Sequence, residues 1–233
     1  MTPPLIAQLS DPHLRLDDET THRALTAAVD RVLALRPPPS AVLLTGDIAD
    51  SGDPREHALA DELLAPLGLP VHRVAGNHDL LPDRTEFAVE AGGLRLVGCD
   101  TSVHGRDDGA LDLDALAARL DDDRETPTIV AMHHPPFDVG LPWLDEIGLP
   151  RADRDALAKL LARSPQVKRV VAGHVHRAIA TTIGGVGAVT CASTNIQAAL
   201  DFTTTEMALA DEPPSFLVHV LLGEEIVTHV HPV

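Results

Sequence analysis

The sequence has few cysteines and no long hydrophobic run. Cys99 and Cys191 are too few for a disulfide scaffold, and because both lie in apolar segments we expect them to be reduced and buried. No apolar stretch approaches the ~18 residues that a membrane span needs. The first residues, Met1-Thr2-Pro3-Pro4, place no basic segment ahead of an apolar one, so no signal peptide is expected. These absences predict a soluble, cytoplasmic protein with no membrane partner.

Basic residues are also scarce relative to acidic residues. The chain has 18 Lys and Arg residues against 35 Asp and Glu residues, which gives a formal net charge of −17. A protein that binds long DNA or RNA normally carries a basic stripe, and this sequence has none. Long nucleic acids are therefore excluded as expected partners. Histidine is abundant instead, with 13 residues, and several of them fall in short clusters at the ends of apolar runs.

Short apolar runs alternate with helical periods along most of the chain. The predicted strands cover residues 5–9, 41–44, 71–75, 94–99, 128–132 and 167–172. The predicted helices cover residues 22–35, 54–67, 111–120 and 153–162, the second of them capped by Asp53. Residues 178–191 and 216–230 are typical of hairpins. The pattern predicts an α/β fold with parallel strands, an antiparallel α+β tail and a single domain that spans residues 1–233.

Polar side chains follow five of the predicted strands, at the point where each strand ends. They are Ser10-Asp11-Pro12-His13, Thr45-Gly46-Asp47, Gly76-Asn77-His78-Asp79, His133-His134-Pro135-Pro136 and Gly173-His174-Val175-His176. The carboxyl ends of strands in an open α/β sheet face one crevice, so these groups can converge there. Oxygen ligands mixed with imidazoles suit Mn, Fe, Co or Zn. The set is too large for one ion and fits two ions that share a bridging carboxylate.

In this order, the five motifs resemble those of the calcineurin-like metallophosphoesterases, and the resemblance spans residues 5–195. The loop from His133 to Leu149 is similar to that of the class III cyclic nucleotide phosphodiesterase branch. The resemblance implies a four-layer α/β/β/α sandwich with two mixed sheets. Some members of the family dimerise through an added cap, so a homodimer is left open as an alternative.

The resemblance also implies a role for each polar residue of the motifs. Asp47 would bridge two metal ions, one of them held by Asp11, His13 and His176 and the other by Asn77, His133 and His174. His133 is preferred to His134 because the ligand in this family lies two residues before the proline.

Substrate contacts are implied for a smaller group. His78 would contact the phosphate and the leaving group, with Asp79 orienting its ring and Asn77 close to the substrate. Asn195 would also contact substrate, or would be a turn residue. Trp143 is interpreted as a loop anchor, with base stacking as the alternative. Other histidines, such as His219, are expected to form local hydrogen bonds.

The sequence therefore predicts a hydrolase that cleaves small phosphodiesters, most favourably 3′,5′- or 2′,3′-cyclic nucleotides. Two divalent or mixed-valence ions would lower the pKa of a shared water, which then supplies hydroxide for attack on phosphorus. Phosphomonoesters and glycerophosphodiesters are alternative substrates for the same site. A binding scaffold without activity is the third alternative, and it is disfavoured because both Asn77 and His78 are present.

Overall fold

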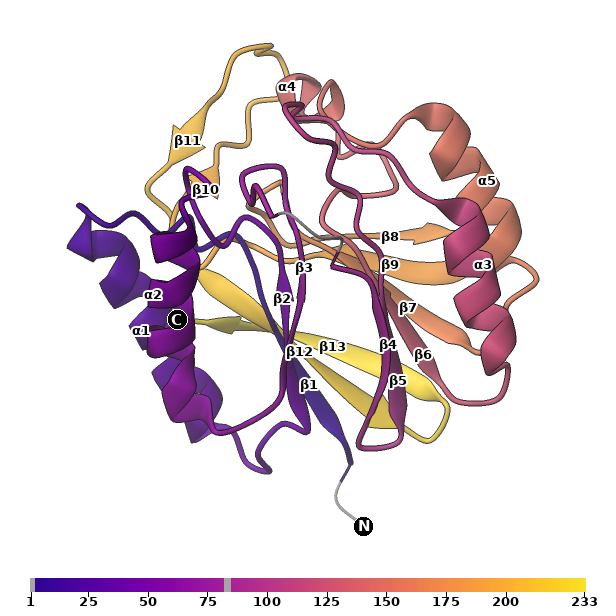
Figure 1. Ribbon diagram of the computed structural model, residues 1–233. Helices are drawn as coiled ribbons and strands as arrows, with labels where there is room; N and C mark the ends of the chain where they lie inside the picture. The colour runs from indigo at the N-terminus through magenta and orange to yellow at the C-terminus, as the bar shows by residue number, and fades with distance from the viewer. Residues whose placement is uncertain (1–2, 82–84) are drawn as a thin grey trace.

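The computed structural model describes residues 3–81 and 85–233 of the chain (Figure 1). Met1 and Thr2, which belong to the segment inspected for a signal peptide, lie outside these ranges. No helix within the described ranges is long and apolar enough to cross a membrane. Cys99 and Cys191 are buried free thiols, as predicted.

Two large mixed sheets organise the described residues. The five-stranded sheet has the order β13 (Glu225–Pro232), β12 (Ser215–Leu222), β1 (Leu5–Leu9), β2 (Ala41–Thr45), β3 (Val71–Val74). The six-stranded sheet has the order β4 (Phe87–Ala91), β5 (Leu94–Gly98), β6 (Thr128–Ala131), β7 (Val167–Ala172), β9 (Val186–Thr190), β8 (Ile179–Ile183). A separate antiparallel pair consists of β10 (Gln197–Ala198) and β11 (Leu209–Ala210). The predicted α/β architecture with two mixed sheets is confirmed.

Helices cover the outer face of each large sheet (Figure 1). The five-stranded sheet carries α1 (Glu19–Ala34) and α2 (Pro54–Leu64), the latter continued by the 3-10 turn η1 (Ala65–Leu67). The six-stranded sheet carries α3 (Leu113–Asp122) and α5 (Arg151–Leu161). The short helix α4 (Pro142–Asp145) lies near the β10–β11 pair at one end of the sandwich. The order of layers is therefore helix, sheet, sheet, helix.

Three apolar layers hold this sandwich together. Successive side chains of a strand point to opposite faces, so Leu5 and Leu9 of β1 pack toward α1, while Ile6 packs between the sheets with Leu43 and Leu96. Every residue of β1 is buried. Burial on both faces explains why apolar residues occupy both faces of this strand, with Gln8 as its one polar residue.

Some elements differ from the predicted ones. Helix α1 begins at Glu19, earlier than His22, because the Asp18 carboxylate caps it by accepting a hydrogen bond from the Thr20 N–H at 2.9 Å. Strand β9 pairs in parallel with β7, which corrects the prediction of a purely antiparallel tail. Strand β4 was not predicted, although its exposed and buried residues alternate as they do in a half-buried edge strand. The elements α4, β10 and β11 are too short to show a periodicity.

A buried polar bridge joins the two sheets. His219 of β12 donates from Nε2 to Gln8 Oε1 at 2.9 Å, and Gln8 Nε2 donates to the Ala172 carbonyl of β7 at 3.0 Å. The Thr228 hydroxyl donates to His219 Nδ1 at 2.9 Å. Both ring nitrogens of His219 are thus paired, which bears out its expected role in hydrogen bonding. The pairing fits a neutral imidazole.

We expect His219 to make the stability of the protein depend on pH. Burial lowers the pKa of His219 from 6.5 to about 3, so at pH values between these the unfolded chain binds a proton that the folded protein does not. Stability therefore falls as the pH drops through this window, by about 1.4 kcal/mol per pH unit for this one group. His219→Gln should reduce the slope of the unfolding free energy against pH by about that amount in urea denaturation. An identical slope in the two proteins would contradict the prediction.

Candidate metal centre

The predicted ligands lie at the carboxyl ends of strands from both large sheets. Asp11 and His13 follow β1, Asp47 follows β2, Asn77 follows β3, His133 follows β6, and His174 and His176 follow β7. They do not converge over one open sheet, as the strand pattern predicted, because the ends of two facing sheets meet at this edge. The His174 N–H donates to Asp11 Oδ1 at 3.0 Å, which joins the end of β7 to the end of β1.

One group of donor atoms consists of two imidazoles and two carboxylates. His13 Nε2 and His176 Nε2 are 3.1 Å apart. Asp47 Oδ2 lies 3.5 Å from His13 Nε2, and Asp11 Oδ1 lies 3.6 Å from His176 Nε2. These four side chains form a compact cluster whose donor atoms could surround a single metal ion.

A second group of donor atoms lies beside the first and shares Asp47 with it. Asn77 Oδ1 is 3.1 Å from both His133 Nε2 and His174 Nδ1. These two ring nitrogens are 3.2 Å apart. Asp47 Oδ2 lies 3.4 Å from His133 Nε2, so one carboxylate oxygen reaches both groups.

The spacing and the type of these atoms fit metal ions. Donor atoms bound to an ion at ~2.1 Å lie ~3.0–3.4 Å apart, which is close to the distances within both groups. Neighbouring imidazole nitrogens at 3.1 and 3.2 Å can share at most one proton between each pair. Within the described ranges, the ion pairs of Asp11 and Asp47 involve only histidines. Both groups therefore lack a permanent cation, and a metal ion would provide it.

Burial shapes the ionisation of these side chains. Burial, together with the nearby Asp47, raises the pKa of Asp11 to about 6, although His133 and His13 oppose this shift. Burial also disfavours the protonated form of His133, but Asp47 and Asp11 outweigh it and raise the pKa of His133 to about 9. Metal ions that bind these side chains would compete with their protons.

Backbone strain is concentrated at the same positions. Among the described residues, positive φ angles outside glycine occur at Asp11 (51°), His13 (44°), Asp47 (48°), His174 (70°) and His176 (49°). A non-glycine residue in this region costs ~1–3 kcal/mol and persists only where its surroundings hold it. Hydrogen bonds from Asp11 N to Gly46 O (3.1 Å) and from His13 N to Asp47 O (3.0 Å) do so here.

Two glycines allow the loops to approach one another. A Cβ atom at Gly76 would overlap Asp47 Oδ1, and one at Gly173 would overlap Ser10 Oγ. A Cβ at Gly173 would also lie 2.8 Å from Asp11 Oδ2. The glycines that precede Asn77 and His174 are thus required by close packing around the two carboxylates.

The ring of His78 is oriented differently from the expectation. Its Nδ1–H donates to the Asp50 carbonyl at 2.7 Å, so a backbone oxygen orients it in place of Asp79. Asp79 instead accepts hydrogen bonds at 2.9 Å from the backbone N–H groups of Ile48, Ala49 and Gly76. Asp79 therefore joins the loop after β2 to the loop after β3.

His134 lies beside His133 and His174, but its ring nitrogens are hydrogen-bonded to other groups. Its Nε2–H donates to the Asp107 carbonyl at 3.0 Å, and its Nδ1 accepts from the Thr101 hydroxyl at 2.9 Å. Burial lowers the pKa of His134 to about 3, in keeping with a neutral ring. With both nitrogens occupied, His134 has no atom left for a metal, which favours His133 as the ligand.

A cavity of about 350 Å³ opens onto the donor groups. Its volume lies in the range of ~300–1,000 Å³ typical of small-ligand sites. The donor groups and His78 line one side, and Trp143 and Asn195 also line it. The backbone N–H of Asn195 donates to Ser193 Oγ at 2.9 Å, so this residue takes part in a turn as well. The cavity thus leaves a substrate contact open for both Trp143 and Asn195.

Sequence analysis missed several polar residues of this cavity, among them Asp50 and Arg15. Asp50 Oδ1 lies 3.2 Å from His13 Nδ1, and Arg15 Nη1 lies 3.9 Å from Asp50 Oδ2. Arg15 is the one Lys or Arg side chain among the described lining residues. Neither residue belongs to a strand-end motif, so the sequence alone carries no signal for them.

The sequence resembles phosphoesterases of known families. It matches the family model of the calcineurin-like phosphoesterases over residues 4–178. It is 30% identical to a probable glycerophosphodiester phosphodiesterase (GpdQ) of Arcobacter nitrofigilis, over 97% of this chain and 92% of that protein. It is 33% identical to the 3′,5′-cyclic adenosine monophosphate phosphodiesterase CpdA of Pseudomonas aeruginosa, over 88% of this chain and 82% of that protein.

A solved structure shares the fold. A dimetal phosphatase from Danio rerio superposes with a TM-score of 0.73, over 98% of this chain and 96% of that chain. The two sequences are 16% identical, so this likeness concerns the fold alone.

Proposed function

The chain belongs to the calcineurin-like phosphoesterase family, and from this premise we propose that it hydrolyses small phosphodiesters, with cyclic nucleotides as the favoured substrates. The observation that carries the proposal is the pair of donor groups that share Asp47 and face one cavity. Relatives named as cyclic nucleotide phosphodiesterases support the substrate class.

The proposal assigns seven side chains to two metal ions. Asp47 would be shared, with Asp11, His13 and His176 completing one site and Asn77, His133 and His174 the other. Bound Mn, Fe, Zn or Co ions, divalent or mixed-valence, would supply Lewis-acid charge to the phosphoryl oxygens and acidify a water. The left-handed loops keep these side chains in place before a substrate arrives.

His78 is proposed as the residue that protonates the leaving oxygen. Its Nδ1–H is committed to the Asp50 carbonyl, no described residue hydrogen-bonds to its Nε2, and the residue lines the cavity. In its protonated form, Nε2 can donate a hydrogen bond to a phosphoryl oxygen. As water adds to phosphorus it releases one proton to solvent, the ester P–O bond breaks, and the proton of His78 passes to the departing oxygen, which leaves as an alcohol.

Charge favours diesters over monoesters. Two bound divalent ions would bring four positive charges, of which the buried carboxylates of Asp11 and Asp47 offset two. A phosphodiester monoanion leaves part of this positive charge for an attacking water, whereas a monoester dianion would neutralise it, and the formal net charge of −17 on the whole chain further disfavours long polyanions within ~8 Å of the surface. Small diesters are therefore the substrates that fit the site best.

Glycerophosphodiesters are the second candidate substrate class. The relative from Arcobacter nitrofigilis, which covers nearly the whole chain, bears that activity in its name. The chemistry at phosphorus is the same for both classes, since each substrate is a monoanionic diester. The alcohol groups of the diester, and not the donor groups of the site, would decide between them.

Replacing Asp47 should reduce the amount of bound metal more than replacing a residue that contacts only one ion. We expect Asp47→Ala to lower the number of bound ions more than His13→Ala or Asn77→Ala, because its carboxylate reaches both donor groups. Elemental analysis of the proteins loaded with Mn would measure this. His229→Ala, which removes an exposed imidazole on β13, is the control and should bind as much metal as the original protein. Two ions retained by Asp47→Ala would overturn the shared assignment.

Replacing His78 should lower turnover without removing metal. We expect His78→Ala to lose ~10²–10⁴ in kcat for a diester with an alkyl leaving group, the range for general acid catalysis. The loss should be smaller for a nitrophenyl leaving group, which departs without a proton. Kinetics with both kinds of diester, together with metal analysis, would check this. Equal losses for the two leaving groups would exclude the acid role.

The proposed reaction can be tested with a panel of four substrates. With Mn and salt held constant, we expect a higher kcat/KM for bis(p-nitrophenyl) phosphate and cyclic AMP than for p-nitrophenyl phosphate, and little cleavage of single-stranded DNA. The reason is the charge of the site and of the surface around it. Faster hydrolysis of the monoester, or efficient DNA cleavage, would contradict the assignment to small diesters.

A further inference from the structure

Six apolar side chains line the same cavity as the donor groups. We call them together the apolar wall, and they are Trp143, Leu144, Ile147, Ile196, Met207 and Leu209. Met207 is 72% exposed and Leu209 is 47% exposed, so the outer part of the wall faces solvent. Single exposed apolar residues are ordinary, but these line a cavity that also contains the candidate metal ligands.

The apolar wall is packed against the strand end that carries two of these ligands. Val175 is buried in a small cluster with Leu141, Leu144 and Ala198. Its neighbours His174 and His176 belong to the two donor groups. Because Val175 lies between them in sequence, the wall and the donor groups share one rigid support.

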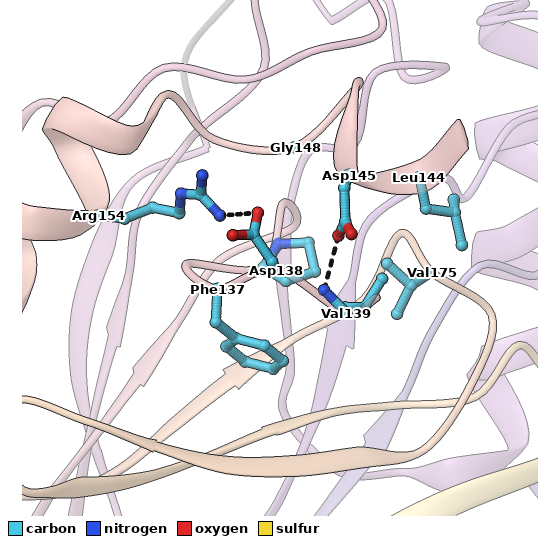
Figure 2. Close-up of a pocket in the computed structure, with 9 residues that line it drawn as sticks. Phe137, Asp138, Val139, Leu144, Asp145, Gly148, Arg154 and Val175 are labelled. Carbon is cyan, nitrogen blue, oxygen red and sulfur yellow. Dashed lines mark hydrogen bonds and ion pairs between the residues drawn. The ribbon is translucent and has the colours of Figure 1, made fainter. Parts of the chain in front are cut away.

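The carboxylates of Asp138 and Asp145 hold the loop from which Leu144 extends (Figure 2). The two oxygens of Asp145 accept hydrogen bonds from the backbone N–H groups of Val139 (2.6 Å) and Gly140 (3.0 Å). Arg154 of α5 pairs with Asp138 in the same loop. These contacts close residues 138–145 into a compact turn, from which Trp143 and Leu144 reach the cavity.

The outer part of the wall is tied to the same strand end. His176 donates from Nδ1 to the Ile196 carbonyl at 2.8 Å. Arg177 donates to the Ala198 carbonyl and, from Nη2, to Glu212 Oε2 at 2.8 Å. Leu209 pairs with Ala198 between β11 and β10, so residues 196–212 are anchored at both ends.

Trp143 is held by packing and not by its polar atom. Its Nε1 is buried and has no hydrogen-bond partner among the described residues, and its ring packs with the cluster around Leu141 and Leu144. The wall therefore offers a ligand a nonpolar surface of aromatic and aliphatic groups. Such a surface suits a planar ring and gives a polyhydroxyl chain no partner for its hydroxyl groups.

We propose that the apolar wall receives the nucleobase of a cyclic nucleotide while its phosphate lies at the donor groups, and that Asp145 is a positioning residue that holds the wall in place. The inference rests on the proposed phosphodiesterase function. It makes the wall the determinant that favours nucleotides over glycerophosphodiesters, because the two substrate classes differ in the group attached to the phosphate and not in the phosphate itself.

The test compares two diesters on the metal-loaded full-length protein. The substrates are 3′,5′-cyclic AMP, which carries a base, and glycerophosphoethanolamine, which carries no ring. For each variant we compare kcat/KM for cyclic AMP with kcat/KM for glycerophosphoethanolamine, and we expect both Trp143→Ala and Leu209→Ala to lower this ratio. The decrease should be about 10- to 100-fold for Trp143→Ala and should arise mainly from a higher KM for cyclic AMP. Trp143→Phe should restore part of the ratio, since it keeps a planar ring.

Two further variants separate position from fold. Asp145→Asn should lower the same ratio through KM, with the bound metal unchanged. Leu33→Ala is the matched control for Leu209→Ala, because Leu33 is 40% exposed on α1, and it should leave the ratio unchanged. The melting temperature of each variant would identify any protein that fails to fold. If Trp143→Ala does not fold, the comparison of Leu209→Ala with Leu33→Ala still tests the proposal.

The possible outcomes distinguish a failure of the proposed function from a failure of the nucleobase site. If the original protein hydrolyses neither diester, the proposed function fails and the inference fails with it. If the original protein is active but Trp143→Ala and Leu209→Ala lower both activities equally, the function stands and the nucleobase site is overturned. Unchanged kinetics combined with a shift from dimer to monomer in these variants would also overturn it, and would assign the wall to contact with a second copy of the chain.

Discussion

The carboxylate of Asp47 is the constraint on which the rest of the site depends. It is 2% exposed, and its Oδ2 lies 3.5 Å from His13 Nε2 and 3.4 Å from His133 Nε2. Burial raises the pKa of a carboxyl group, but His133 and His13 outweigh this effect and hold the pKa of Asp47 well below its ordinary value. An ionised carboxylate at this depth requires positive charge beside it. The convergence of imidazoles from two sheets on this one side chain follows from that requirement.

Bringing these side chains together strains the backbone, and the fold offsets the cost. Asp11, Asp47 and His174 adopt left-handed conformations two residues after the ends of β1, β2 and β7. These strands cannot shift without exposing apolar side chains to water, since each of the three contributes residues to the layer between the sheets. The three backbone hydrogen bonds accepted by Asp79 then fix the loops after β2 and β3 relative to each other.

The end of β7 supports both the donor groups and the apolar wall. His174 and His176 belong to the donor groups, and Val175 between them packs with Leu141 and Leu144. A substitution that displaces Val175 would therefore disturb the donor groups and the wall together. Of the apolar wall, Trp143, Leu144 and Ile147 lie within the residues matched by the family model, whereas Ile196, Met207 and Leu209 lie beyond them.

The sequence by itself determined the strands that lead into the site, the helices, and the set of polar residues at the strand ends, because periodicity, helix caps and short motifs depend on neighbouring residues. It did not reveal β4, the parallel pairing of β9 with β7, the partner of His78, or the apolar wall. Apart from β4, which pairs with the neighbouring β5, these features depend on contacts between residues far apart in the sequence, such as the hydrogen bond between His78 and Asp50. Only the tertiary structure decided them, because the free energy of a long-range contact is set by the packing of whole layers and leaves no periodic trace in the residues that form it.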